Sequence, residues 1–121
     1  MNHESSHALH RQIDEPAALA GLDGNRDLLH DLADMFCEDA PIILGELRSA
    51  LEADDTSAAR RAAHSLKGLA ATFYAQPTIE QAERLEHEAA SGELAPLKEG
   101  GVDKLEQCVN ALIAELQSRC S

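Results

Sequence analysis

Hydrophobic residues recur along most of the chain at steps of three and four, the spacing that places side chains on one face of an α-helix. No segment shows the strict alternation of a β-strand. Four helical stretches follow one another with short connections, so the pattern predicts an all-α protein, an antiparallel four-helix bundle. The residues expected to face the core are Leu28, Leu32, Met35, Ile43, Leu47 and Leu51, then Ala59, Ala62, Leu66, Leu69 and Phe73, then Ile79, Ala82, Leu85 and Ala89, and finally Val102, Leu105, Val109, Leu112 and Leu116.

Capping and turn residues mark the boundaries of the predicted helices. Asn25 follows an Asp-Gly turn and caps the first helix, and the cluster at 54–57 ends that helix and caps the second. Residues 76–78 end the second helix. Pro41 lies inside the first helix, and because proline lacks a backbone donor and crowds the preceding turn, we expect a kink or a restart at 39–40.

The N-terminal part of the chain shows a weaker pattern. Residues 1–14 carry no sustained hydrophobic period and are expected to form a frayed tail or a loosely docked helix ahead of a bundle domain over 15–121. The short hydrophobic segment 16–22 then leads into the Asp-Gly turn. A short N-terminal extension, either a helix that covers one end of the bundle or a disordered segment, is expected as well. Neither a signal peptide nor a transmembrane span can be read from the chain, so a cytoplasmic protein is expected.

Composition and charge narrow the range of functions. A chain of 121 residues has the size of one domain, which leaves no room for a nucleotide-binding domain beside a substrate domain. The net charge of −12 repels phosphate backbones and anionic lipids, so neither nucleic acid nor a membrane surface is expected as a partner. Because copies with the same charge repel one another, the protein is expected to be a monomer. Cys37, Cys108 and Cys120 lack metal-binding spacing and are read as reduced thiols, the first two near core faces.

One histidine of the second helix faces away from the predicted core. At about 100° per residue, His64 lies about 200° from Ala62, so its imidazole is expected to be exposed. Gly68 lies one turn further on, where no helix end is signalled, although glycine costs about 1 kcal/mol relative to alanine inside a helix. This cost indicates that a partner approaches closely at this point.

The charge pattern around this histidine is unlike that of the rest of the chain. No Asp or Glu lies between positions 56 and 79, whereas Arg60, Arg61 and Lys67 do. Ala71 falls on the same exposed face. An unprotonated imidazole nitrogen is a nucleophile, and cations favour an incoming phosphoryl group. The sequence therefore predicts a low, cationic surface suited to phosphoryl chemistry.

Residues 63–68 read A-H-S-L-K-G and resemble the H-x-x-K-G signature of histidine-containing phosphotransfer (HPt) domains, the four-helix modules of multistep phosphorelays. The resemblance covers roughly residues 16–117 and includes the segments 35–41 and 82–86. It implies that Nε2 of His64 accepts a phosphoryl group from an aspartyl phosphate of a receiver domain and passes it to a second receiver. It also implies that Lys67 stabilises the phosphoryl charge and that Gly68 leaves space for the partner.

The resemblance further implies a carrier rather than an autonomous enzyme. Its partners would be the receiver domains of response regulators or of a hybrid sensor histidine kinase, and the Mg²⁺ would belong to the receiver, with no cofactor of this chain's own and no metal site. The residues expected to contact the partner are Arg60, Arg61, Gly68, Ala71 and Tyr74. Tyr74 is a departure, because the family often carries glycine at this position; on a continuous helix it would lie toward the His64 side.

Two alternatives remain open at this stage. His3, Glu4 and His7 form a literal H-E-x-x-H motif, in which two histidines one turn apart bind zinc and the glutamate activates water, and His10 could be a third ligand. This motif lies at the chain terminus and lacks a helical hydrophobic period. The other alternative is a helical adaptor whose His64 face binds an acidic partner without chemistry.

Overall fold

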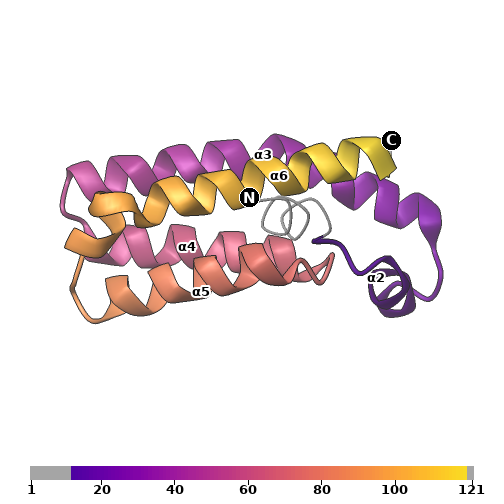
Figure 1. Ribbon diagram of the computed structural model, residues 1–121, viewed down its shortest axis with the longest axis horizontal. Coiled ribbons are helices and arrows are strands. Elements are labelled where there is room, and N and C mark those ends of the chain that lie inside the picture. Colours follow the sequence, from indigo (N-terminus) through magenta and orange to yellow (C-terminus); the bar gives the residue numbers. More distant parts are fainter. Residues whose placement is uncertain (1–11, 120–121) are drawn as a thin grey trace, which may run out of the picture.

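Four long helices, antiparallel to their neighbours along the chain, form the body of the molecule in the computed structural model, which describes residues 12–119 (Figure 1). The short helix α2 (Glu15–Gly21) precedes them, and a wide turn η1 (Leu97–Gly101) connects the last two. The four long helices are α3 (Arg26–Glu52), α4 (Thr56–Ala71), α5 (Gln76–Ala90) and α6 (Val102–Arg119). Residues 12–119 contain no strand. The predicted all-α four-helix bundle is confirmed.

Side-chain caps fix where three of the helices begin. Asp14, Asn25 and Asp55 each accept a hydrogen bond from the amide three residues later, at 3.1, 3.0 and 3.0 Å. These bonds satisfy amides in the first turn that have no partner within the helix. The starts of α3 and α4 therefore follow from capping residues that the sequence analysis singled out.

Of the two expectations at Pro41, a kink or a restart, the restart is wrong, because α3 runs unbroken for 27 residues with Pro41 inside it. A proline in a helix interior costs about 3 kcal/mol. Burial of Phe36, Leu44 and Leu47 in the core contributes roughly 1.5–3 kcal/mol for each side chain and so outweighs that cost.

The inward face of α3 also differs from the prediction. Leu28 and Met35 are 39% and 52% exposed rather than buried. The helix carries two hydrophobic stripes, and the one that enters the core includes small alanines, which a search for large side chains undervalues. The α3 residues that form the core are Leu29, Ala33, Phe36, Ala40, Leu44, Leu47, Ala50 and Leu51. In the other three helices the predicted core positions are buried, apart from Leu69 and Ile79, which are half-buried.

Gln12, which the sequence analysis assigned to a tail, is instead buried in the bundle. Its backbone amide donates to Oε1 of Glu115 at 2.7 Å, and its side-chain Nε2 donates to the carbonyl of Cys108 at 2.9 Å. Thr78 Oγ1 donates to the Gln12 side-chain oxygen. These bonds tie the start of the described chain to α5 and α6. The helix α2, which the sequence analysis did not assign, then lies across one end of the bundle (Figure 1).

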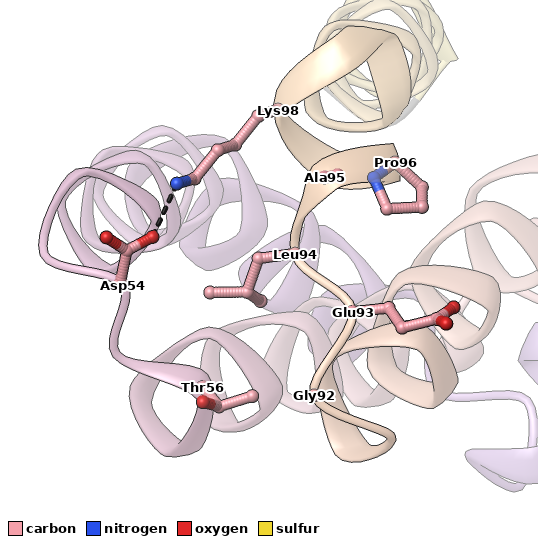
Figure 2. A pocket seen from close by; sticks show the side chains of 8 residues that line it. All are labelled: Asp54, Thr56, Gly92, Glu93, Leu94, Ala95, Pro96 and Lys98. Atoms are coloured by element: carbon pink, nitrogen blue, oxygen red, sulfur yellow. Dashed lines mark hydrogen bonds and ion pairs between the residues drawn. The ribbon is translucent and has the colours of Figure 1, made fainter.

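The other end of the bundle is closed by two connections that pack against each other. Figure 2 shows Lys98 of η1 reaching to the turn between α3 and α4, where its Nζ lies 2.5 Å from Oδ1 of Asp54. Leu94 is buried beneath this ion pair, and Gly92 has a φ of +85°, the left-handed conformation that ends α5. The shallow hollow here lies at the start of α4, about 12 Å along the helix axis from His64.

Candidate functional site

His64 lies in the middle of α4 with its side chain 64% exposed. Its neighbours Ala63 and Leu66 are fully buried. Because those two positions fix which side of the helix faces the core, the imidazole faces outward, as the helical spacing predicts. A continuous helix therefore presents the candidate nucleophile at its midpoint.

A carboxylate from the neighbouring helix connects His64 to Lys67. Oε2 of Glu86, on α5, lies 2.7 Å from Nδ1 of His64, and Oε1 lies 2.8 Å from Nζ of Lys67. The Glu86 side chain is only 16% exposed. Oε1 of Glu86 is shielded from solvent and has no hydrogen-bond partner among the described residues. Its contact with the ammonium of Lys67 is therefore described as an ion pair. Glu86 therefore contacts both the histidine and the lysine of the H-x-x-K-G motif.

Glu86 and Lys67 each stabilise the charged form of the other. Lys67 lowers the pKa of Glu86 most, burial of the carboxylate acts in the opposite direction, and His64 lowers the pKa further. The contact with Glu86 in turn raises the pKa of the Lys67 ammonium. Near neutral pH the site therefore contains an ionised carboxylate and an ammonium.

Glu86 also determines which ring nitrogen of His64 can react. An ionised carboxylate only accepts hydrogen bonds, so Nδ1 carries the hydrogen and donates it to Glu86. In the neutral ring Nε2 then has the lone pair, which leaves it as the nucleophilic atom. The arrangement is one that can attack an electrophilic phosphorus from the exposed side of α4.

Sequence reasoning missed Glu86. It lies in the segment 82–86 that carries part of the family resemblance, but the sequence analysis gave it no role. Its position directly after the core residue Leu85 was visible, but the register of α5 against α4, which decides that it meets His64, depends on packing between helices. An acidic residue beside a core position, on the helix that follows the H-x-x-K-G motif, is the signal that could have found it.

The other predicted contact residues lie on the surface of α4 without joining this group. Arg60 and Arg61 are exposed, and Nη1 of Arg61 donates to Ser57 Oγ at 3.0 Å. Gly68 and Ala71 are exposed as well. A Cβ atom added to Gly68 would meet nothing within 4 Å, so no internal contact requires a glycine there.

The predicted placement of Tyr74 on the helix is wrong, because α4 ends at Ala71. Tyr74 lies in the following turn with a φ of +53°, and its hydroxyl lies 3.9 Å from where a Cβ of Gly21 in α2 would be. The left-handed conformation costs about 1–2 kcal/mol for a residue other than glycine. This geometry explains why glycine suits the position, and it places the Tyr74 hydroxyl beside α2.

No metal site and no membrane span is found in the part of the chain that the structure describes. Within it, no three His, Cys, Asp or Glu side chains are grouped so that they could hold a metal ion. The H-E-x-x-H motif at 3–7 and Cys120 lie outside this part. None of its helices is long and apolar enough to cross a membrane.

Comparison with known proteins agrees with this geometry. The family model described as Hpt domain matches residues 31–118, which is well over half of the chain and includes α4, α5 and the whole site. No curated protein and no solved structure matches the chain. The extent of the family match, over an exposed histidine held on a four-helix bundle, shows that the chain belongs to the Hpt domain family, the histidine phosphotransfer domains of phosphorelays.

Proposed function

We propose that this protein carries a phosphoryl group on Nε2 of His64 within a multistep phosphorelay, accepting it from the aspartyl phosphate of one receiver domain and passing it to another. The observation that supports this most directly is the bond between Nδ1 of His64 and Glu86, at 2.7 Å, on an exposed helix face. It leaves Nε2 free to react. Lys67, 2.8 Å from the same carboxylate, supplies a cation for the phosphoryl oxygens.

On the carrier, His64 and Glu86 are sufficient to account for every bond and charge in the transfer step. The Nε2 lone pair forms the new bond to phosphorus, the bond from phosphorus to the aspartyl oxygen breaks, and the receiver regains a free carboxylate. The ring keeps its hydrogen on Nδ1 and becomes positively charged. Glu86 stabilises that charge, and the reverse sequence returns the phosphoryl group to a receiver.

The carrier's partners follow from this chemistry. Phosphoryl transfer depends mainly on positioning and charge stabilisation, so the receiver would provide the Mg²⁺ and the carrier would need no cofactor and would not use ATP. The receivers would belong to response regulators or to a hybrid sensor histidine kinase. We propose that Arg60 and Arg61 face the receiver, that Gly68 gives it room, and that the carrier acts as a cytoplasmic monomer.

The test is incubation of the protein with phosphorylated receiver domains and Mg²⁺, followed by measurement of acid-labile, base-stable phosphate on the chain. Label is expected on the wild type and on His87→Gln, a matched control in which another exposed histidine is replaced. His64→Gln is expected to carry none. Receiver binding without label on the wild type would instead support an adaptor, and label retained on His64→Gln would assign the chemistry to another residue.

A further inference from the structure

A polar groove lies between α5 and α6, and no step of the proposed function uses it. Its volume is about 440 Å³, a size that suits a small molecule. This hollow is here called the α5–α6 groove. The residues that line it are Pro77, Glu80, Gln81 and Arg84 of α5 and Lys104 and Cys108 of α6.

The α5–α6 groove and the His64 site lie on opposite sides of α5. Arg84 and Glu86 flank a core position of this helix, at about −100° and +100° around its axis. Glu86 contacts His64, so the positive side of α5 faces α4. The negative side faces α6, where Nε2 of Gln81 donates to the carbonyl of Gly101 at 3.3 Å. A molecule in the groove is therefore separated from His64 by the width of α5.

Two cations of the α5–α6 groove have no carboxylate partner within 12–119. Arg84 and Lys104 are exposed, and neither side chain forms an ion pair or a hydrogen bond with a described residue. Other cations of the described chain do contact a carboxylate, namely Arg26, Arg48, Lys67 and Lys98. The chain has 22 acidic and 10 basic side chains, so two neighbouring cations without an acidic partner are available to an anion from outside.

The α5–α6 groove also offers hydrogen-bond acceptors. Gln81 is only 7% exposed, and its Oε1 accepts no hydrogen bond from a described residue. Glu80 is the one carboxylate of the lining, and its Oε2 accepts from Nε2 of Gln76 at 3.3 Å, a contact along α5 rather than across the groove. An amide oxygen and a carboxylate both accept hydrogen bonds from hydroxyl groups. A ligand that matches the lining therefore carries donors as well as an anionic group.

The thiol of the α5–α6 groove adds no negative charge. Cys108 is 6% exposed, and burial raises the pKa of its thiol, while Lys104 acts in the opposite direction from nearby. The thiol is therefore neutral near pH 7 and does not compete with an anion for Lys104.

The whole molecule limits the size of the anion. A polyanion such as nucleic acid, or an acidic protein, is repelled by the net charge of −12. Two cations in a small groove instead suit a compact ligand with a single anionic group.

We infer that the α5–α6 groove binds a small hydroxylated oxyanion, a molecule with one phosphate or carboxylate group and neighbouring hydroxyl groups. The oxyanion lies between Arg84 and Lys104, whose guanidinium and ammonium donate charge-assisted hydrogen bonds to it. The hydroxyl groups donate to Oε1 of Gln81 and to Glu80. This site is separate from His64, so the inference does not rest on the proposed function.

The test is a titration of the isotope-labelled protein with glycerol phosphate and with glycerate, followed by nuclear magnetic resonance. The two probes share their hydroxyl groups, so they distinguish a phosphate from a carboxylate, and glycerol is the control without an anion. Saturable shifts are expected at the amides of Gln81, Arg84, Lys104 and Cys108, with a dissociation constant in the millimolar range for the better probe. No saturation is expected with glycerol.

A pair of double variants checks the role of the two cations. Arg84→Gln combined with Lys104→Gln is expected to raise the dissociation constant about tenfold, because the oxyanion loses both donors. Arg60→Gln combined with Arg61→Gln removes the same charge from exposed positions of α4 and is expected to change it less than about twofold. Circular dichroism melting checks that both variants are folded.

Three results would overturn the inference. One is the absence of saturable shifts with either probe, or their appearance on α4 instead of the α5–α6 groove, and this result needs only the wild type. Another is equal weakening by the two double variants, since binding would then follow net charge. The third is saturation by glycerol with the same affinity, which would show that no anion is recognised. None of these measurements involves phosphoryl transfer, so failure of the proposed function would be seen separately.

Discussion

At the scale of single residues, one carboxylate organises the site. Glu86 accepts the Nδ1 hydrogen of His64 and pairs with Lys67, so it orients the nucleophile and holds the nearby cation at once. On the proposed function, the cation that would meet the phosphoryl group is already paired before the group arrives. The phosphoryl oxygens would then compete with Glu86 for Lys67.

Replacing Glu86 with glutamine should slow phosphoryl transfer to His64 about tenfold, because the developing positive charge on the ring loses its ionised partner. The measurement is the single-turnover rate at saturating receiver. Glu83→Gln is the control, since Glu83 is exposed and has no contact with His64 among the described interactions. Equal rates in the wild type and in Glu86→Gln would contradict the positioning role.

The same carboxylate gives a prediction for the pH dependence of stability. Because the pKa of Glu86 is lowered in the folded protein, its contribution to stability is present above the ordinary carboxyl pKa and is lost as the pH falls through the lowered value. The midpoint of thermal unfolding should therefore be higher for the wild type than for Glu86→Gln at pH 7. The two midpoints should converge in acid, once the pH lies below the lowered pKa of Glu86. A difference that stays constant as the pH falls from 7 into the acid range would argue against ionisation as its source.

Tyr74→Gly should raise the free energy of unfolding by about 1 kcal/mol, since it relieves a left-handed backbone at a residue other than glycine. The measurement is urea denaturation. Asp23→Gly is a matched control, because Asp23 also has a positive φ, of 55°, but aspartate tolerates this conformation better. A loss of stability in Tyr74→Gly would show that the contact of Tyr74 with α2 outweighs the backbone strain.

At the scale of helices, features that depend on neighbouring residues could be predicted from the sequence, whereas features that depend on packing between helices could not. The caps at Asn25 and Asp55 and the outward direction of His64 depend on residues within one turn, and they were predicted correctly. The contact of Glu86 with His64 depends on the register between α4 and α5, which no single helix encodes. The exposure of Met35 likewise depended on which of two stripes the bundle would bury.

Gly68→Ala separates stability from function within α4. The change should raise the free energy of unfolding by roughly 0.5–1 kcal/mol, because a Cβ there meets nothing within 4 Å. It should also raise the half-saturating concentration for a receiver, because the added methyl group lies beside His64. Gly45→Ala on α3 is the matched control, since its Cβ also meets open space. Equal transfer by the two variants would show that Gly68 gives no room to the partner.

At the scale of the whole molecule, the first described residues act as part of the bundle. Oε1 and Oε2 of Glu115 accept hydrogen bonds from the amides of Gln12 and Ile13, at 2.7 and 3.2 Å. The next amide, of Asp14, donates to the carbonyl of Phe73 at 3.1 Å. Hydrophobic patterning could not reveal this docking, because polar groups hold the segment in place.

Glu115→Ala should therefore destabilise the protein by about 1–3 kcal/mol, because the buried amide of Gln12 and the partly buried amide of Ile13 lose their acceptor. Hydrogen exchange at residues 12 and 13 should accelerate more than exchange at residues of α4. An unchanged exchange rate at those two amides would show that other contacts hold the segment.

The place of His64 in the middle of an unbroken helix has a consequence for how a relay would run. Within residues 12–119, the imidazole is carried by a continuous helix rather than by a loop, so transfer would need no reordering of the segment that holds it. Forward and backward transfer would then pass through the same arrangement of atoms. The direction of flow would be determined outside this molecule, by how often each receiver meets it and how strongly each holds its phosphate.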